Sequence, residues 1–147
     1  MKAIQSNTFT RGIYAVVIIL LSTLLLQSCS RKVSFQTSQV VPAAEGSVKV
    51  KKDNNNNYKI DLKLVRLADP KRLSPSKEMY VVWMKTERNG TKNIGRLETS
   101  SGFLSKTLKS SLETVTSFKP TQVFITAEDN ASVQYPAGQV VLTTGNF

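Results

Sequence analysis

An alternation of apolar and polar residues between positions 47 and 64 constrains the fold more than any other feature of the chain. In residues 47–51 and again in residues 59–64, every second side chain is apolar and those between them are polar, mostly lysine. A period of two places the apolar side chains on one face of a strand and the polar ones on the other. The stretch from Asp53 to Asn57 joins the two segments, and asparagine tolerates the left-handed backbone of tight hairpin loops. The pattern predicts an antiparallel hairpin with one buried and one solvated face.

Further strands are predicted at short intervals after this hairpin. Residues 78–86 are apolar on both faces, which indicates a central strand, and Asn89-Gly90 predicts a tight turn after it. More strands are expected over residues 94–98, 102–108, 112–118, 123–128 and 139–144. Residues 104–115 also fit a helical turn, because their apolar side chains recur every three to four positions. About seven or eight short strands in about 100 residues are typical of an all-β fold, an antiparallel β-sandwich.

An apolar segment precedes this β-rich part of the chain. Lys2 and Arg11 give it a basic start, and residues 13–26 are apolar except for Ser22 and Thr23. A membrane-spanning helix needs about 20 apolar residues, whereas the core of a cleaved signal peptide needs about 7 to 15. The length therefore predicts a signal peptide.

The apolar segment ends in Leu26-Gln27-Ser28-Cys29, and Cys29 is the single cysteine of the chain. This arrangement resembles the lipobox of bacterial lipoproteins, in which the cysteine is lipidated and becomes the first residue of the mature protein. The resemblance implies that Cys29 anchors the protein to a membrane of the cell envelope, facing the periplasm. Ser30 follows the cysteine where an aspartate would favour the inner membrane, so the outer membrane is expected. The alternative is an ordinary signal peptide or a short membrane anchor that happens to carry a cysteine.

Three parts of the chain are therefore expected. They are a lipoprotein signal peptide over 1–28, a polar lipid-anchored tether over 29–46 and a β-sandwich domain over 47–147. Val33 to Thr37 would alternatively add a short first strand. Two of the 20 basic residues, Lys2 and Arg11, leave with the signal peptide and all 10 acidic residues remain, so the formal charge falls from +10 to +8.

The second half of the chain carries four segments that recur together in one known family. They are Tyr80-Val81-Val82-Trp83-Met84, Asn93-Ile94-Gly95-Arg96-Leu97, the run from Val123 to Glu128 and the run from Tyr135 to Leu142. In combination they resemble the extracytoplasmic C-terminal domain of the anti-sigma-K factors, over just under half of the chain. The resemblance implies an immunoglobulin-like all-β domain outside the cytoplasm.

The chain also departs from that family. Only 12 residues precede the apolar segment, too few for the cytoplasmic domain that holds a sigma factor, and a lipobox stands in place of the spanning helix. The family's turn of glycine and proline after its glutamate is replaced by Asp129-Asn130-Ala131-Ser132. We therefore expect that this chain binds no sigma factor directly.

The residue types argue against catalysis. The chain has no histidine, which removes the commonest general base and the commonest metal ligand, and no activated serine motif replaces it. Asp53, Asn55 and Asn57 have the first spacing of a calcium loop, but Tyr58 and Leu64 occupy the positions that need glycine and an acid. We expect no enzyme activity, no cofactor and no metal site.

Four lysines define a possible basic face. Lys49, Lys51, Lys59 and Lys63 occupy the solvated positions of the predicted hairpin. Such residues form a solvated surface first of all, and a stripe able to meet anionic lipid or glycan second. Nucleic acid is not expected outside the cytoplasm, and no aromatic-rich binding face accompanies the lysines. Trp83 lies among apolar neighbours, which favours core packing over ligand stacking.

Two functions fit these features. The first is a lipid-anchored interaction or sensing module that binds another envelope protein. Its candidate contacts are the loops Asp69–Ser76 and Asp129–Gly138, pre-shaped by Pro70, Pro75 and Pro136. The second is a structural lipoprotein that binds anionic lipid or glycan through the basic face.

The lipid anchor gives the first prediction. Metabolic labelling with a fatty acid such as palmitate should mark the wild-type protein and leave Cys29→Ser unmarked, because the thiol is the attachment point. Equal labelling of both proteins would contradict the assignment of Cys29.

Overall fold

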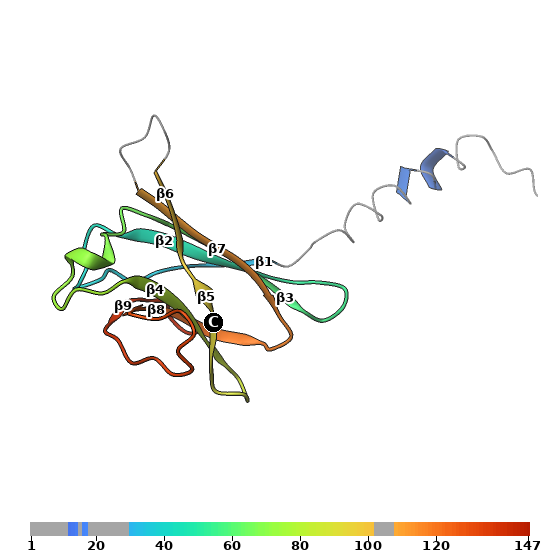
Figure 1. Cartoon of the computed structure of the whole chain (residues 1–147). Coiled ribbons are helices and arrows are strands. Elements are labelled where there is room, and N and C mark those ends of the chain that lie inside the picture. The colour runs from blue at the N-terminus through green and yellow to red at the C-terminus, as the bar shows by residue number, and fades with distance from the viewer. Residues whose placement is uncertain (1–11, 15, 18–29, 102–107) are drawn as a thin grey trace, which may run out of the picture.

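The described part of the chain is mostly β, with a short 3-10 helix over Pro70–Arg72. A computed structural model of the protein describes residues 12–14, 16–17, 30–101 and 108–147, so most of the predicted signal peptide and Cys29 lie outside it. The described residues form nine strands in two antiparallel sheets (Figure 1). No helix among them is long and apolar enough to cross a membrane.

The first sheet has five strands and contains the predicted hairpin. In spatial order it consists of β1 (Ser30–Ser34), β2 (Glu45–Lys52), β3 (Tyr58–Val65), β7 (Leu108–Thr116) and β6 (Glu98–Ser101). β2 and β3 pair as the sequence predicts, with Val48 opposite Leu62. The Asp53 carboxylate accepts the N–H groups of Asn55 and Asn57, both at 2.8 Å, and Asn56 takes a φ of 63°. These features close the hairpin loop.

The second sheet has four strands and places the predicted central strand inside it. Its order is β5 (Thr91–Arg96), β4 (Met79–Thr86), β8 (Pro120–Glu128) and β9 (Val140–Thr143). β4 pairs with β5 on one side and with β8 on the other, so it is an interior strand. Both of its faces are apolar because Val82 and Met84 pack between the sheets, whereas Val81 and Trp83 pack in a second cluster on the other face. Gly90, with a φ of +69°, forms the turn between β4 and β5.

The two sheets share one hydrophobic core. Ile60, Leu62 and Leu64 point inward from the first sheet, whereas Val82, Met84 and Ile125 come from the second. All six are at most 1% exposed. The predicted buried face of the hairpin is therefore confirmed, because its apolar side chains lie in this core.

The segment expected to be a tether belongs to the folded domain instead. Ser30 to Ser34 form β1, which pairs with β2 so that Ser30 lies opposite Lys51. Farther along, Val41 and Ala44 are only 5% and 4% exposed, and the Ser38 hydroxyl donates to the carbonyl of Val141 at 2.5 Å. The domain thus begins at residue 30, not 47. The alternative prediction of a short strand over residues 33–37 overlaps β1 at residues 33 and 34.

The region from 94 to 118 also differs in detail from its prediction. The strand expected over 94–98 becomes two strands, and the chain passes from the second sheet to the first at Leu97. The strand expected over 102–108 lies outside the described residues except for its last position. The strand expected over 112–118 is β7, so the helical alternative is wrong for residues 108–115. Hydrogen bonding to β3 from Lys109 to Thr116 holds the backbone of this segment in the extended conformation.

Candidate functional site

Strand register gives the domain two opposite ends. Ser30 begins β1 beside the last residues of β2, and Lys52 lies opposite Tyr58, which lies opposite Thr116. We call this the Ser30 end. The loops of residues 35–44 and 66–78 lie at the opposite end, which we call the loop end (Figure 1).

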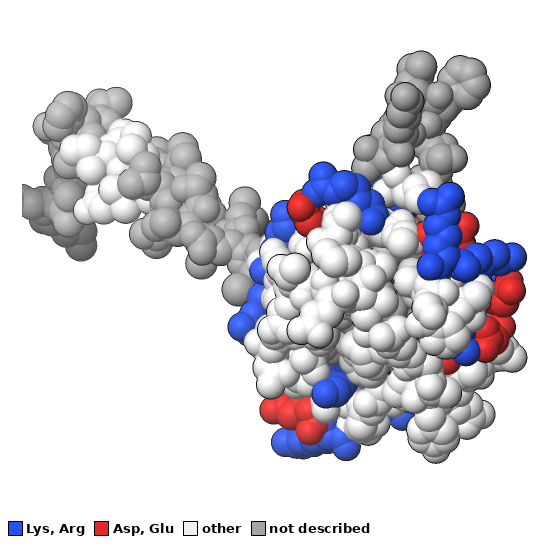
Figure 2. All heavy atoms as spheres, turned by 90° about the vertical axis from the view of Figure 1, so that its left-hand side faces the viewer, with Lys and Arg blue, Asp and Glu red and all other residues white. Residues whose placement is uncertain are grey.

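The loop end has a largely uncharged centre. In Figure 2, which views this end, most of the central surface is neither acidic nor basic, and charged residues gather at the margin. The two loops contribute exposed uncharged residues to this end: Gln39, Pro42, Ala43, Ser74, Pro75 and Ser76. Three ion pairs also occur among the charged residues of these elements: Arg66–Glu45, Lys71–Glu78 and Lys77–Asp129. Such a surface can contact a protein without desolvating unpaired charge at its centre.

The two candidate contact loops predicted from the sequence are joined through a residue at the edge of the first. Lys77, directly after the predicted loop Asp69–Ser76, binds the Asp129 carboxylate at the start of the second, with 2.6 Å between Nζ and Oδ2. The N–H of Glu78 also donates to the carbonyl of Glu128 at 3.1 Å. The structure therefore joins segments that lie 52 residues apart in the chain.

A buried carboxylate holds the second of these loops, residues 129–139. Glu128 is 3% exposed, and its Oε1 accepts the Thr126 hydroxyl at 2.7 Å and the N–H groups of Ala137 and Gly138 at 3.1 and 2.9 Å. The Trp83 indole N–H donates to the same Thr126 oxygen at 2.7 Å. A carboxylate satisfied by several donors fixes both ends of the loop against β8.

Gly138 is required for this close approach. A Cβ atom at this position would lie 1.8 Å from the carbonyl oxygen of Ala127 on β8. The N–H of Ala127 donates to the Gln139 carbonyl at 3.1 Å in the same place. Any larger residue would push the loop away from the strand and break the contacts of Glu128.

Trp83 is fully buried, as predicted, but it lies outside the core between the sheets. It stacks on Phe124 with ring centroids 6.3 Å apart, on the outer face of the second sheet. Val133 of the 129–139 loop packs on this pair, and Asn93 of β5 donates to the carbonyls of Ala131 and Val133, both at 2.9 Å. The loop therefore folds back over the sheet and covers the tryptophan.

Apolar and aromatic groups remain exposed on this fixed loop and beside it. Tyr135 is 79% exposed, and Val140, the first residue of β9, is 50% exposed. Pro136 between them is also exposed. An exposed tyrosine on a well-held loop is a common feature of binding surfaces.

The four predicted lysines share the outer face of the first sheet. Lys51 lies opposite Lys59, Lys49 lies opposite Asp61, and Lys63 lies opposite Ser47. β1 adds Lys32 directly opposite Lys49. All four predicted lysines are exposed, as the alternation implies.

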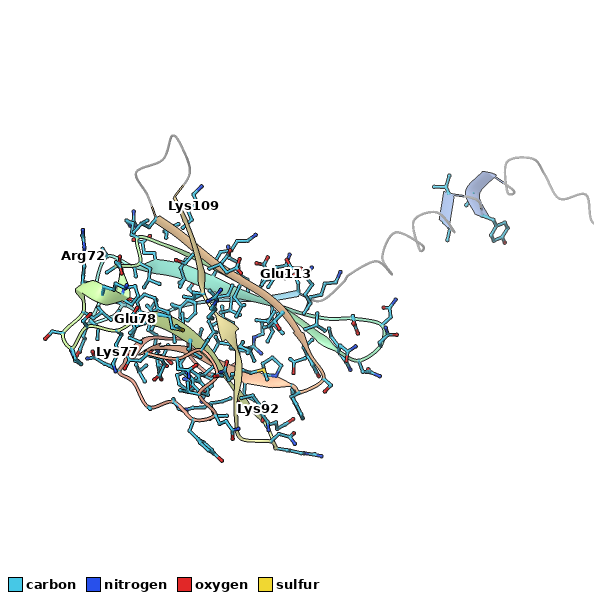
Figure 3. The ribbon with its side chains drawn as sticks, viewed as in Figure 1. Arg72, Lys77, Glu78, Lys92, Lys109 and Glu113 are labelled. Carbon is cyan, nitrogen blue, oxygen red and sulfur yellow. The ribbon has the colours of Figure 1, made fainter. Side chains whose placement is uncertain are left out.

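Acidic residues divide this basic face. Lys59 forms an ion pair with Glu113 of β7, whose side chain is labelled in Figure 3. Lys63 contacts Asp61 at 3.3 Å. The hydrogen bond and the charge of Glu113 raise the pKa of Lys59 above its ordinary value. Among the described residues, Lys49 and Lys51 form no ion pair. The face is therefore mixed, and its unpaired charge lies towards β1 and β2.

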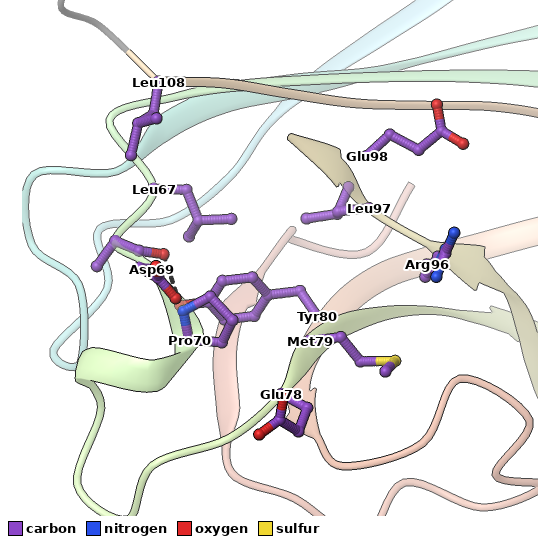
Figure 4. A pocket seen from close by; sticks show the side chains of 11 residues that line it. Leu67, Asp69, Pro70, Glu78, Met79, Tyr80, Arg96, Leu97, Glu98 and Leu108 are labelled. Atoms are coloured by element: carbon purple, nitrogen blue, oxygen red, sulfur yellow. Dashed lines mark hydrogen bonds between the residues drawn. The ribbon is translucent and has the colours of Figure 1, made fainter. Parts of the chain in front are cut away.

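A cavity of about 580 Å³ opens near the loop end (Figure 4). Asp69, Glu78 and Arg96 line it together with apolar residues such as Leu67 and Leu97. The Tyr80 hydroxyl donates to the carbonyl of Ala68 at 3.0 Å, and burial, with the Asp69 charge, raises the pKa of Tyr80 to about 12. This hydroxyl is protonated at neutral pH and is a poor base. The described residues contain no cluster of His, Cys, Asp and Glu able to hold a metal ion.

Compared with known protein families, with characterised proteins and with solved structures, the chain gives no match.

Removal of the Glu128 carboxylate should release the 129–139 loop. Glu128→Ala leaves the Thr126 hydroxyl and two N–H groups without their acceptor, and hydrogen bonds to charged groups contribute about 1.5–3 kcal/mol each. Because a released loop lets these groups reach water and the variant no longer buries a carboxylate, we expect a net fall in the free energy of unfolding of roughly 3 kcal/mol in denaturant melts followed by Trp83 fluorescence.

Glu87→Ala is the matched control, since Glu87 is exposed and makes one ion pair, with Lys119. It should leave the midpoint almost unchanged. If the two variants melt alike, the Glu128 contacts do not support the loop.

Proposed function

We propose that the protein is a non-catalytic lipoprotein of a bacterial cell envelope that binds a partner protein outside the cytoplasm. The lipobox at Cys29 supports the anchor, and Ser30 after it favours the outer membrane and a periplasmic location. The observation that carries the partner binding is the fixed 129–139 loop with its exposed Tyr135. A loop that is already ordered loses little conformational entropy when it binds.

Strand order supports an immunoglobulin-like sandwich for this domain. In that fold the strands A-B-E-D form one sheet and C-F-G the other, and some members add C′ beside C. The orders β2-β3-β7-β6 and β5-β4-β8-β9 correspond to A-B-E-D and C′-C-F-G, with β1 as an addition. The chain departs from antibody domains in its tryptophan, since Trp83 packs outside the core and a single cysteine permits no internal disulfide.

The same correspondence supports the choice of surface. The loops 66–78 and 129–139 take the places of the B–C and F–G loops, which bind antigen in antibody variable domains. Lys77 and Asp129 join these two loops in this chain.

Binding of anionic lipid or glycan through the basic strand face is the second candidate. The alternating lysines favour it. The ion pairs Lys59–Glu113 and Lys63–Asp61 weaken it, because they neutralise two of the four lysines on that face. A partner protein at the loops is therefore preferred.

Photocrosslinking in intact cells tests the preferred function. A photoreactive residue at Gln134, which is exposed beside Tyr135, should give a discrete protein adduct. Tyr135→Ser should abolish that adduct, because the ring provides most of the apolar contact that the loop offers.

Val115 is the matched control, since it is 59% exposed on the opposite sheet. Val115→Ser should leave the adduct at Gln134 intact. If Val115→Ser abolishes the adduct as well, or if Tyr135→Ser preserves it, the loop is not the binding surface.

A further inference from the structure

The Ser30 end of the domain gathers basic residues around the start of the first strand. Lys51 lies directly opposite Ser30, and Lys59 lies opposite Lys51 on the next strand. Neighbouring strands are about 5 Å apart, so these backbone positions lie roughly 5 and 10 Å from Ser30. Arg31 and Lys52 are adjacent in the chain to Ser30 and Lys51, so the strand alternation places them on the opposite face of the sheet from Lys51 and Lys59. The Arg31 guanidinium lies over the Phe147 ring, 5.8 Å from its centroid, and all four basic side chains are exposed. We call these four residues, Arg31, Lys51, Lys52 and Lys59, the basic cluster.

The charge of the basic cluster is only partly balanced. Lys59 pairs with Glu113, but within the described residues Arg31, Lys51 and Lys52 have no acidic partner. Asp53 lies close by, and its carboxylate is engaged by N–H groups of its own loop. At the loop end Arg66, Lys71 and Lys77 each contact a carboxylate, whereas Arg72 and Lys109 have no acidic partner among the described residues. Both ends therefore carry unpaired positive charge, and at the Ser30 end it lies beside the start of β1.

The proposed lipidation site, Cys29, lies next to the Ser30 end in the chain. Cys29 directly precedes Ser30, and consecutive Cα atoms are about 3.8 Å apart. Because β1 pairs with β2 from Ser30 onward, no free segment separates Cys29 from the sheet. If Cys29 carries acyl chains, the basic cluster is held within about one Debye length, 8–10 Å, of the headgroups.

We infer that the basic cluster docks the domain on anionic lipid headgroups, so that the Ser30 end faces the membrane and the loop end faces away from it. This inference rests on the proposed lipid anchor. One basic residue near an anionic surface strengthens association roughly fivefold. Arg31, Lys51 and Lys52 together would therefore hold the domain in one orientation relative to the membrane.

Lysine acetylation of the reconstituted protein tests the docking. The full lipidated protein is placed in phosphatidylcholine vesicles with or without phosphatidylglycerol, and the reaction rate of each lysine is read by mass spectrometry. We expect phosphatidylglycerol to slow Lys51, Lys52 and Lys59 several-fold at low salt and high salt to reverse the effect. Lys71 and Lys109, which lie away from the Ser30 end, should react equally in both vesicles.

Two double variants separate the basic cluster from the overall charge. In Lys51→Glu/Lys52→Glu, Lys59 should lose its protection by phosphatidylglycerol. In Arg72→Glu/Lys109→Glu, which makes the same change of charge away from the Ser30 end, Lys59 should keep it (Figure 3).

The outcomes distinguish the docking from the anchor. A protein that fails to float with phosphatidylcholine vesicles has no effective lipid anchor, which overturns the proposed function and the docking with it. A protein that floats, but whose Lys51, Lys52 and Lys59 react alike in both vesicles, overturns the docking alone. Equal loss of protection in both double variants also overturns the docking.

Discussion

The pairing of β1 with β2 is the constraint on which the orientation of the molecule depends. The hydrogen-bonded ladder includes Ser30, the residue directly after Cys29 in the chain. It also fixes which end of the two sheets lies beside the N-terminal segment. Because strands of eight or nine residues span roughly 25–30 Å, the loops at the other end are held well away from that point. A polar linker would leave the domain free to turn about a lipid anchor, whereas the paired strand keeps the Ser30 end next to the proposed one.

The loops owe their order to polar contacts that converge on Glu128. This carboxylate lies at the end of β8, where the apolar surface of the strand ends and the 129–139 loop begins. Its bonds to Thr126, Ala137 and Gly138 fix the loop, and Asn93 fixes the middle of it from the neighbouring strand. Burial of a carboxylate costs free energy, and these hydrogen bonds offset that cost. The result is a 129–139 loop held in one conformation. The ordered surface is the one that we assign to a partner.

The sequence predicts features that depend on local pattern and misses those that depend on distant pairing. The hairpin, the central strand and the outward lysines follow from a period of two, which is visible within a few residues. β1 is expected only as an alternative, three residues too late, because Val33 is its one apolar side chain and its pairing with β2 cannot be seen locally. Asp61 shares the basic face by the same period of two, but Glu113 reaches this face only because β7, about fifty residues later, pairs with β3. A glutamate directly after the apolar run 123–127 was the one available signal for the Glu128 contacts.

Energy transfer to the membrane tests the oriented domain most directly. Single dyes would be attached at Asn55→Cys in the hairpin loop or at Ser76→Cys in the 66–78 loop of the lipidated protein, with acceptor lipids in the vesicle. Both positions are exposed, and they lie at opposite ends of the sheets. The account predicts efficient transfer from position 55 and much weaker transfer from position 76, since roughly 25 Å of strand separates them. Equal transfer from the two positions would contradict it.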